Sequence, residues 1–582
     1  MDGLKERAAQ WGIETEYWDG LGRHRAVEAE TLACLLDTLT KAGPPVAPSA
    51  SPAGSGHAYQ GKESAPKKLW ALAVQLYGVR SRRNWGHGDF TDLIGLIELA
   101  ARLGAAGVGL NPLHALFDDR ADEFSPYSPS SRLFLNTHYI DVEAIPEHRD
   151  AGVGEAVAAA RRAGLVDYAG VTATKGKALR LAYDAFRQEP KRGRKTRFAA
   201  FRKAGGKLLT RFSCFEYLRR RHGGPWWTWP EEWRAPDDKK LKLLRADEDD
   251  EIGYYEYLQW IADAQLSAAR ERAAALNLPI GLYLDIAVGV RADGFDAWNA
   301  QGVIEPALEI GAPPDPLNLE GQHWGLAGVN PIALAKENCE PFRAVLRASM
   351  RYAGAVRLDH VMALQRLYQI PAGMRGDQGA YIRFPFAQML AAVAEESAAN
   401  RCIVIGEDLG TVPENFRETV GAAGIWSYQV MLFQRAADGG FIAPDHYREN
   451  ALVTFGTHDL PTFSGWKSGH DLGVKRMLGL DPGETSETRK AAQEAMARTM
   501  AWHGFPALDY PNVIGFLAST PSRLLCVSVE DVLQLTEQVN VPGTVAEHPN
   551  WRRRLPVDLE NLGEVPMLKT VAEILAAKGR RA

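Results

Sequence analysis

The sequence predicts an α/β protein built on a (β/α)8 barrel of the TIM type, with large, mostly helical insertions and a small N-terminal helical element. Eight short segments rich in apolar and β-branched residues recur along the chain, and amphipathic helical patterns separate most of them. Alternation of strands with helices indicates a parallel sheet. Several of the segments also end in acidic residues, and a (β/α)8 barrel carries its functional groups at the carboxyl ends of its strands.

The length of 582 residues leaves room for insertions between the elements of a barrel. Helical patterns such as Pro341–Tyr352 and Phe386–Ser397 lie between expected strands. The eight expected strands are, in chain order, Trp70–Leu76, Gly107–Leu110, Ile280–Leu284, Ala355–Leu358, Ile403–Ile405, Tyr428–Phe433, Leu452–Phe455 and Leu524–Val527.

The first 66 residues precede the expected barrel. Residues 1–42 predict a small N-terminal element of two helices, around Leu4–Trp11 and Glu28–Leu39, with a glycine-containing turn between them. Residues 43–66 are rich in proline, serine and glycine, a composition that buries little apolar surface and predicts a linker. The barrel domain is therefore expected over residues 67–582.

The interval between the second and third expected strands is much longer than one crossover helix requires. Structureless segments of such length are uncommon in compact domains. The sequence therefore predicts an inserted, mostly helical region over about residues 140–275.

Charge and hydropathy exclude several classes of partner. The 67 Lys and Arg against 72 Asp and Glu give a net charge of −5, which offers no reason to expect a polyanionic partner. The basic stretch Lys191–Arg197 lacks an accompanying nucleic-acid motif and is interpreted as a solvated helix face or loop. No run of about 18 apolar residues occurs, and the N-terminus lacks the apolar core of a signal peptide. We expect no nucleic-acid and no membrane partner.

Cysteine and histidine spacing argues against metal and cofactor chemistry. The five cysteines are scattered and form no Cys-x-x-Cys motif, which is typical of reduced thiols in a cytoplasmic protein. The histidines at 87, 114, 360 and 458 do not share the spacing of ligands on one helix. No phosphate-binding glycine loop is present either. We expect neither a metal nor a cofactor.

Four acidic residues lie at the ends of expected strands or shortly after them. They are Asp285 after the third strand, Asp359 after the fourth, Glu407 after the fifth and Asp459 after the seventh. Any one of them alone is commonly a solvated residue at a strand end. Four in strand order favour an active site built from carboxylates.

Two carboxyl groups are what cleavage of a glycosidic bond requires, one as acid and one as nucleophile. Arg357 and Asp359 are two residues apart, so in an extended strand they share a face, and the guanidinium favours an ionised carboxylate. Glu407 ends an apolar strand, where burial favours the protonated form that a general acid needs. Asp459 is expected to bind sugar hydroxyls by charge-assisted hydrogen bonds.

Ordered motifs extend this interpretation over most of the chain. They are Leu76–Arg80 with Asn84–Asp89, Asn111–His114, Ser125–Pro129, Gly311–Asp315 with Gly321–Gly325, Ile370–Gly373, Gly406–Pro413, Thr457–Pro461, and Asn540–Thr544 with Asn550–Arg552. With these motifs the chain resembles the bacterial 4-alpha-glucanotransferases, the amylomaltases or disproportionating enzymes of the α-amylase superfamily. The resemblance runs from about Leu72 to Leu555.

The resemblance implies a role for each matching residue. Asp359 matches the nucleophile, Glu407 the acid/base and Asp459 the stabiliser of the transition state. The substrate-binding positions that it implies are Arg357, His458 and Asp285 in the −1 subsite, Tyr127 stacking on glucose, Asp315 and Trp324 on an active-site loop at about 311–325, and Asn540 closing the site. Pro316–Asn318 and Val361–Leu364 depart from many members and resemble a subgroup that acts on short maltodextrins.

The implied reaction is transfer of a 1,4-α-glucan segment to the 4-hydroxyl of an acceptor glucose or glucan, through a covalent glycosyl-enzyme. Its partners would be maltodextrin or other α-1,4-glucan donors and glucose or maltodextrin acceptors. Hydrolysis of α-1,4-glucans on the same residues is the first alternative, because both reactions share the intermediate. A non-catalytic glucan-binding protein is the second, although all three carboxylates are present.

Overall fold

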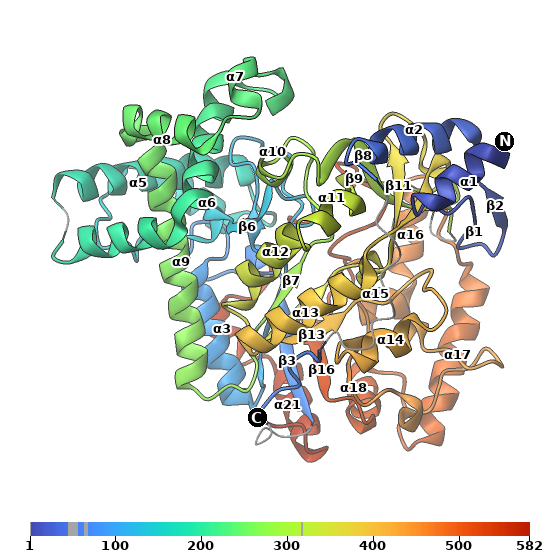
Figure 1. Cartoon of the computed structure of the whole chain (residues 1–582). Coiled ribbons are helices and arrows are strands. Elements are labelled where there is room, and N and C mark those ends of the chain that lie inside the picture. Colours follow the sequence, from blue (N-terminus) through green and yellow to red (C-terminus); the bar gives the residue numbers. More distant parts are fainter. Residues whose placement is uncertain (1, 45–55, 63–67, 190, 316–317) are drawn as a thin grey trace.

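The computed structural model describes residues 2–44, 56–62, 68–189, 191–315 and 318–582 (Figure 1). Its centre is a closed barrel of eight parallel strands that follow one another around the ring in chain order. The strands are β3 (Leu69–Val74), β4 (Gly107–Leu110), β7 (Gly281–Ile286), β10 (Ala355–Leu358), β13 (Ile403–Gly406), β14 (Trp426–Val430), β15 (Ala451–Thr454) and β16 (Leu524–Ser528). The predicted (β/α)8 barrel is confirmed.

The sixth strand lies earlier than the sequence predicts. The prediction placed it at Tyr428–Phe433, whereas β14 begins at Trp426 and ends at Val430. Pairing with β15 stops at Val430 opposite Thr454, and the next three residues, Met431–Phe433, form a short 3₁₀ helix, η6. The apolar sequence continues beyond Val430, so the sequence pattern did not indicate where the strand ends.

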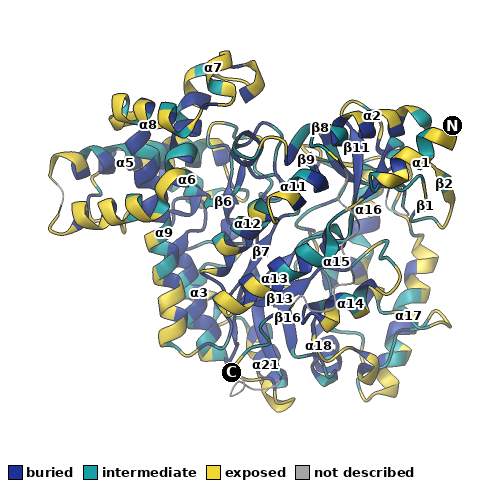
Figure 2. Ribbon diagram, viewed as in Figure 1, coloured by how far each residue is buried: buried dark blue, intermediate teal, exposed yellow. Residues whose placement is uncertain are grey.

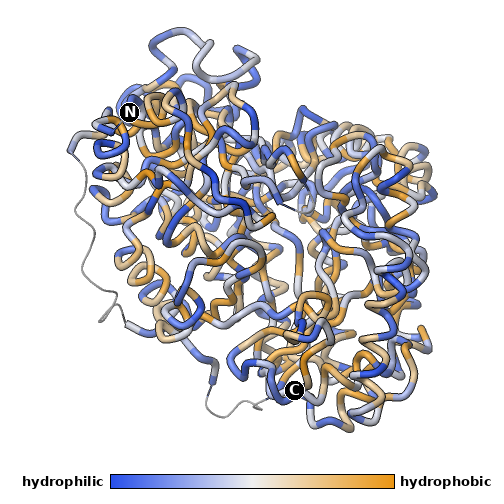
Figure 3. Tube along the Cα trace, turned by 90° about the vertical axis from the view of Figure 1, so that its right-hand side faces the viewer, coloured by the Kyte–Doolittle hydropathy of each residue, from blue (hydrophilic) through white to orange (hydrophobic). Residues whose placement is uncertain are grey.

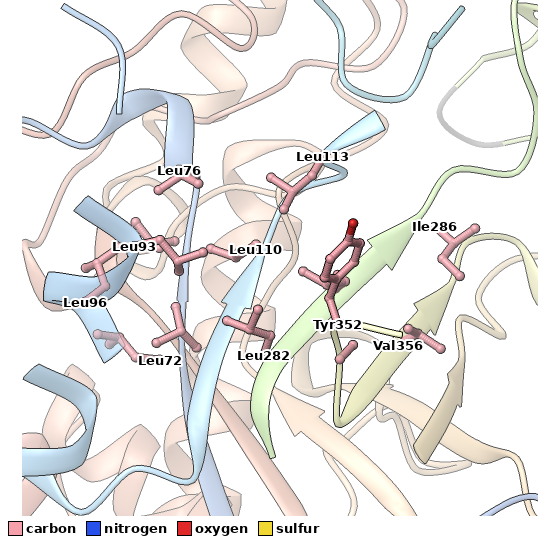
Figure 4. Packing of buried hydrophobic residues seen from close by; sticks show 14 of the residues in the cluster. Leu72, Leu76, Leu93, Leu96, Leu110, Leu113, Leu282, Ile286, Tyr352 and Val356 are labelled. Carbon is pink, nitrogen blue, oxygen red and sulfur yellow. The ribbon is translucent and has the colours of Figure 1, made fainter. Parts of the chain in front are cut away.

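Alternate residues of each strand face the helices and the barrel interior. Figure 4 shows outward residues such as Leu72 of β3 lying against Leu93 and Leu96 of helix α3 (Phe90–Leu103). Inward residues, among them Tyr283 and Cys526, form a separate buried cluster inside the ring. The inward positions at the carboxyl ends of the strands carry the polar groups described below.

A helical region is inserted between β4 and β7. It comprises the short strands β5 (His114–Ala115) and β6 (Ser131–Leu135), η2 (Thr137–Tyr139), α4 (Gly154–Arg162), α5 (Tyr168–Gln188), α6 (Arg194–His222), η3 (Trp226–Thr228), α7 (Glu231–Arg234), α8 (Asp238–Asp247) and α9 (Asp249–Ala275). Helix α9 packs on both α6 and α3 and so joins the insertion to the barrel. Within the basic stretch, Arg194 forms a bidentate ion pair with Glu147 at 2.7 and 2.8 Å.

The remaining elements surround the barrel. Figure 2 shows buried strands at the centre and exposed outer faces on the surrounding helices, and along the helices the trace in Figure 3 changes between hydrophobic and hydrophilic residues. These elements are α10 (Phe295–Asn299), α11 (Pro331–Lys336), α12 (Glu340–Met350), η4 (Val361–Leu364), η5 (Gly376–Gln378), α13 (Phe386–Asn400), α14 (Phe416–Ala422), η7 (Pro444–His446), α15 (Phe463–Ser468), α16 (His470–Met477), α17 (Ser486–Trp502), α18 (Tyr510–Ser519), α19 (Val529–Val532), α20 (Leu559–Leu562) and α21 (Pro566–Ala577). Among the described residues, no helix combines the length and apolar character needed to cross a bilayer.

A second sheet stands beside the barrel and carries the N-terminal element. Its strands, in spatial order, are β12 (Ala380–Arg383), β11 (Arg366–Pro371), β8 (Ile304–Ala312) and β9 (Gln322–Val329). The N-terminal element consists of α1 (Asp2–Gln10), α2 (Ala29–Thr40) and an antiparallel hairpin of β1 (Glu16–Trp18) and β2 (His24–Ala26). The sequence predicted the two helices but not the hairpin.

Part of the predicted linker lies against the barrel. Residues 45–55 and 63–66 lie outside the described residues, but 56–62 are described. The Ala58 amide donates to the Ala423 carbonyl at 2.9 Å, and the Gln60 side chain accepts from the Trp426 indole at 2.8 Å. The predicted linker, although its composition is typical of linkers, thus contains a short segment whose polar groups form hydrogen bonds with the barrel.

Candidate active site

The site begins with a pair of charges in register on neighbouring strands. Asp285 of β7 and Arg357 of β10 are opposite each other in the parallel ladder. Arg357 Nη1 donates to both carboxylate oxygens of Asp285, at 2.9 and 3.0 Å, and both side chains are buried. Both side chains point into the barrel mouth, so the register of β7 and β10 fixes their positions relative to each other.

The same guanidinium joins the two carboxyl groups predicted to do the chemistry. Arg357 Nη2 lies 2.8 Å from Asp359 Oδ1 and 3.8 Å from Glu407 Oε2. The nearest oxygens of Asp359 and Glu407 are therefore no farther apart than those two distances combined. That limit admits the spacing of about 5–5.5 Å that double displacement uses and lies below most of the range of inverting pairs, about 6.5–9.5 Å.

Backbone amides fix the orientation of Glu407. The amide of His360 donates to Oε2 at 2.9 Å and that of Leu409 donates to Oε1 at 2.8 Å. His360 adopts a left-handed backbone conformation, with φ of 49°. A non-glycine residue rarely holds that conformation, and such strain concentrates where a site depends on it. Here it aims an amide at Glu407.

Burial raises the pKa of both carboxyl groups, and Arg357 opposes the rise in each. Burial raises the pKa of Glu407 to about 7; Arg357 opposes the rise and Asp359 reinforces it. Burial also raises the pKa of Asp359 above its ordinary value, against the direct ion pair with Arg357. A glutamic acid with a pKa near neutrality can hold a proton to donate. An aspartate paired with arginine at 2.8 Å is placed to act as a nucleophile.

Asp459 is held by a histidine and an asparagine. His458 Nε2 lies 3.3 Å from Asp459 Oδ2, and Asn540 Nδ2 donates to Oδ1 at 2.6 Å. Burial raises the pKa of Asp459, but the charge and hydrogen bond of His458 and the bond from Asn540 outweigh it, so the pKa lies below its ordinary value. The Asp459 side chain is 44% exposed, which leaves an ionised carboxylate accessible at the site.

Tyr127 connects the two halves of the site. Its hydroxyl donates to Asp285 Oδ2 at 2.5 Å, and its ring stacks on His458 with centroids 4.7 Å apart. The Trp551 ring lies 5.3 Å from that of Tyr127 and 5.4 Å from that of His458. Tyr127, Asp285 and His458 all line a cavity of about 100 Å³ at the barrel mouth.

The two predicted loop residues lie on the β8–β9 hairpin. The Trp324 ring is 5.2 Å from the His360 ring and nearly perpendicular to it, which places this residue beside the catalytic strand ends. Asp315 is farther away, at the hairpin tip, where its Oδ2 accepts from Gln322 Nε2 at 2.7 Å. Residues 316–317 of this loop lie outside the described residues. Eight of the ten predicted site residues thus form one connected network, and Trp324 touches it through His360.

The carboxylates of the site already have partners within the protein. Within the described ranges, no cluster of three or more His, Cys, Asp or Glu side chains has the arrangement of a metal site. Asp285 is engaged by Arg357 and Tyr127, and Asp459 by His458 and Asn540. Carboxylates already paired with cations and amides are arranged to bind and polarise neutral polar groups.

Comparison with known proteins identifies the family. The family model described as 4-alpha-glucanotransferase matches residues 74–559. The chain belongs to the 4-alpha-glucanotransferase family. It is 35% identical over 550 residues to the 4-alpha-glucanotransferase of Haemophilus influenzae, covering 87% of this chain and 78% of that protein. It is also 35% identical over 552 residues to the Mycobacterium tuberculosis 4-alpha-glucanotransferase, covering 88% and 75%.

Solved structures agree on the fold of the family. The crystal structure of amylomaltase from Corynebacterium glutamicum superposes with a TM-score of 0.83 at 26% identity, covering 98% of this chain and 99% of that one. Amylomaltase from Streptococcus agalactiae in complex with acarbose gives a TM-score of 0.72 at 20% identity, covering 88% and 100%. This family membership favours transfer over the hydrolase alternative.

Sequence reasoning missed several residues that hold the site of this family member together. Gln538 Nε2 donates to the Asp459 carbonyl at 2.8 Å and to the Asn540 carbonyl at 2.6 Å, fixing the loop that carries Asn540. Glu530 and Asp531, two and three residues after the end of β16, line the cavity at the barrel mouth, and burial raises the pKa of Asp531 to about 7. Their position after a strand end was a usable signal, the same one that revealed Glu407.

Proposed function

We propose that this protein transfers a segment of a 1,4-α-glucan to the 4-hydroxyl of an acceptor glucose or glucan by a retaining double displacement. The observation that supports this most directly is Arg357 Nη2, which lies 2.8 Å from Asp359 and 3.8 Å from Glu407. One cation thereby binds both the proposed nucleophile and the proposed acid and keeps them within a distance that admits the spacing of the mechanism. Donors would be maltodextrins or other α-1,4-glucans, and acceptors glucose or maltodextrins.

In the first step Asp359 attacks the anomeric carbon and forms a glycosyl ester, while Glu407 gives its proton to the departing sugar oxygen. In the second step Glu407, now ionised, removes the proton of an acceptor 4-hydroxyl. The acceptor oxygen attacks the anomeric carbon, whose bond to the Asp359 oxygen breaks and releases the carboxylate. Asp459, kept ionised by His458 and Asn540, binds sugar hydroxyls and stabilises the positive charge of the transition state. Asp285 and Arg357 position the sugar in the −1 subsite.

Two contacts support sugar rather than water as the second nucleophile. Trp324 lies against His360, and His360 donates its amide to Glu407, so an aromatic ring covers the residue next to the acid/base. Excluding water from a glycosyl-enzyme extends its lifetime until a sugar arrives. We further propose a cytoplasmic location, which the free state of all five cysteines supports.

Incubation of the purified protein with maltotriose tests this proposal, with the products separated by length over time. Transfer gives glucose together with maltopentaose and longer chains. Glucose and maltose alone would identify a hydrolase on the same scaffold, and an absence of products would favour a glucan-binding protein. Asp359→Asn is the matched control, since it should bind maltodextrin without turnover.

A further inference from the structure

The N-terminal element and the active site are joined by a short chain of contacts. The Gly20 amide donates to the Pro314 carbonyl at 2.8 Å, so the hairpin of the N-terminal element touches the tip of the β8–β9 hairpin. A Cβ atom at Gly20 would lie 2.7 Å from Asp315 Cβ and 3.0 Å from its Cα. That approach is closer than real side-chain carbons allow, so only glycine fits there without displacing the tip.

From the tip, hydrogen bonds lead back along the hairpin. Asp315 Oδ2 accepts from Gln322 Nε2 at 2.7 Å, and Gln322 Oε1 accepts from the Trp324 indole at 3.1 Å. The Trp324 ring packs on His360 at 5.2 Å. His360 then donates its amide to Glu407 Oε2 at 2.9 Å. Four contacts thus connect the loop against Gly20 to the acid/base.

The second sheet, which contains β8, β9, β11 and β12, lies between the N-terminal element and the active site. One of its faces packs on the N-terminal element, and the other faces the active site. On β11, Tyr368 and Ile370 pack with the N-terminal element, whereas Leu367 belongs to the cluster that Trp324 joins. Figure 1 shows the N-terminal helices and hairpin beside β8, β9 and β11. The contact is extensive, because α1, α2 and the connecting hairpin contribute to one buried cluster with this sheet.

Polar contacts anchor the N-terminal element on that sheet. Glu14 forms ion pairs with Arg366 at 2.7 Å and Arg383 at 3.4 Å. The hydroxyls of Tyr17 and Tyr368 hydrogen-bond at 3.1 Å. An element fixed this firmly to β11 and β12 can hold the neighbouring hairpin tip in one position.

We propose that the N-terminal element positions the β8–β9 hairpin over the active site, with Gly20 as the positioning residue, and thereby sets how often sugar rather than water captures the glycosyl-enzyme. The inference rests on the proposed transferase function. Neither Asp315 nor Gly20 needs to touch the reacting atoms, because each acts through Gln322 and Trp324. Displacement of Trp324 would loosen the packing around His360 and admit water.

Gly20→Ala tests the proposal with a single methyl group. The backbone φ of Gly20 is not in the left-handed region, so alanine is conformationally permitted, and the methyl must displace Pro314 and Asp315. Gly3→Ala is the matched control on the same element, since nothing lies within 4 Å of its added Cβ. Both variants and the wild type are given maltotriose, and the fraction of cleavage events that end in hydrolysis is measured with the acceptor KM and the Tm.

We expect Gly20→Ala to raise the hydrolysed fraction several-fold and the acceptor KM about tenfold, the scale of losses from small displacements near a site. Gly3→Ala should match the wild type. Equal product ratios in the two variants would overturn the inference while leaving the transferase function intact. A wild type that makes no longer chains would overturn the proposed function itself.

A general loss of stability is separated by a second variant. Arg194→Gln removes the buried ion pair with Glu147 in the inserted helical region and leaves the N-terminal element and the hairpin tip intact. If Gly20→Ala lowers the Tm, Arg194→Gln with a comparable Tm should still give the wild-type product ratio. The same shift in hydrolysis from Arg194→Gln would assign the effect to destabilisation and overturn the positioning role of Gly20.

Discussion

Several arginines of this protein each pair with three carboxylates, and two of these clusters, at the barrel mouth and beside helix α3, make a close comparison. At the barrel mouth Arg357 lies among Asp285, Asp359 and Glu407. Beside helix α3, Arg83 lies 2.5 Å from Asp89, 3.1 Å from Asp92 and 2.8 Å from Asp141. Burial raises the pKa of Asp89 to about 7, the same value as that of Glu407. Neither charge clustering nor a shifted pKa distinguishes the two regions.

The difference lies in how accessible the carboxylates are. Asp89 accepts from the amides of Thr91 and Asp92 and caps α3, and the side chains of Asp89, Asp92 and Asp141 are at most 4% exposed. At the barrel mouth the Asp359 side chain is 20% exposed. Bonds to the backbone do not separate the regions, because Glu407 also accepts from two amides. Exposed oxygens can meet a substrate, whereas fully buried ones cannot. A perturbed carboxyl group marks a site only where it is also accessible.

Matched Asp→Asn substitutions give the largest expected contrast between the regions. Asp359→Asn should lower kcat with maltotriose by at least about 10⁴-fold, because an amide cannot form the glycosyl ester. Calorimetry should still detect maltodextrin binding. Asp92→Asn, in the other cluster, should leave the kcat of the folded enzyme near that of the wild type. Similar kcat losses in the two variants would contradict the assignment of the barrel-mouth cluster, and not the Arg83 cluster, as the active site.

Removing the acid/base should have the next largest effect. Glu407→Gln should lower kcat by about 10²–10⁴-fold, since the leaving sugar loses its proton donor. A donor whose leaving group needs no protonation, such as an α-glucosyl fluoride, should recover the first step. Single-turnover measurements with both donors check this. Equal losses for both donors would contradict the acid role of Glu407.

Loss of Arg83 should affect stability rather than chemistry. Arg83→Met leaves three buried carboxylates without their cation, and breaking a buried pair in this way costs about 3–5 kcal/mol of unfolding free energy. Urea unfolding measures that loss. The kcat of the variant that remains folded should change by less than about twofold, because Arg83 contacts no predicted site residue. A large fall in kcat at unchanged stability would make the second cluster functional.

The pH dependence of turnover should come from the barrel mouth alone. Because Glu407 must be protonated to act as an acid and its pKa is raised to about 7, kcat/KM should fall about tenfold for each pH unit above 7. Asp89 shares that pKa but should add nothing to the profile. A pH series on the wild type and Asp89→Asn measures this. A profile shifted in Asp89→Asn, or flat from pH 7 to 9 in the wild type, would contradict the assignment.

The sequence allowed the barrel and its carboxylates to be predicted because both depend on local patterns. A buried parallel strand is a short apolar run, and Asp285 and Glu407 follow such runs directly. The β8–β9 hairpin and β11 were not predicted. The pairing of β8 with β9 has register shifts, and β8 contains Pro306, so the usual strand pattern is interrupted there.

Contacts made by residues distant in sequence were beyond prediction for a different reason. Gln538 binds Asp459, and Gly20 touches Pro314, through loops whose paths depend on the whole fold. No local periodicity or residue spacing predicts contacts of this kind. The family resemblance supplied Asn540, Trp324 and Asp315, but not the route that links the last two to His360.

Closure of the barrel also decides when the enzyme can first work during its synthesis. Strand β3 pairs with β16 along Leu69–Ala73 and Leu524–Ser528, so the ring cannot close until β16 has left the ribosome. Arg580, near the end of the chain, donates to the Leu69 carbonyl at 3.2 Å. Contacts of such long sequence separation form slowly. A nascent chain that already contains Asp359, Glu407 and Asp459 therefore carries all three carboxylates proposed to be catalytic and still has no complete barrel to hold them.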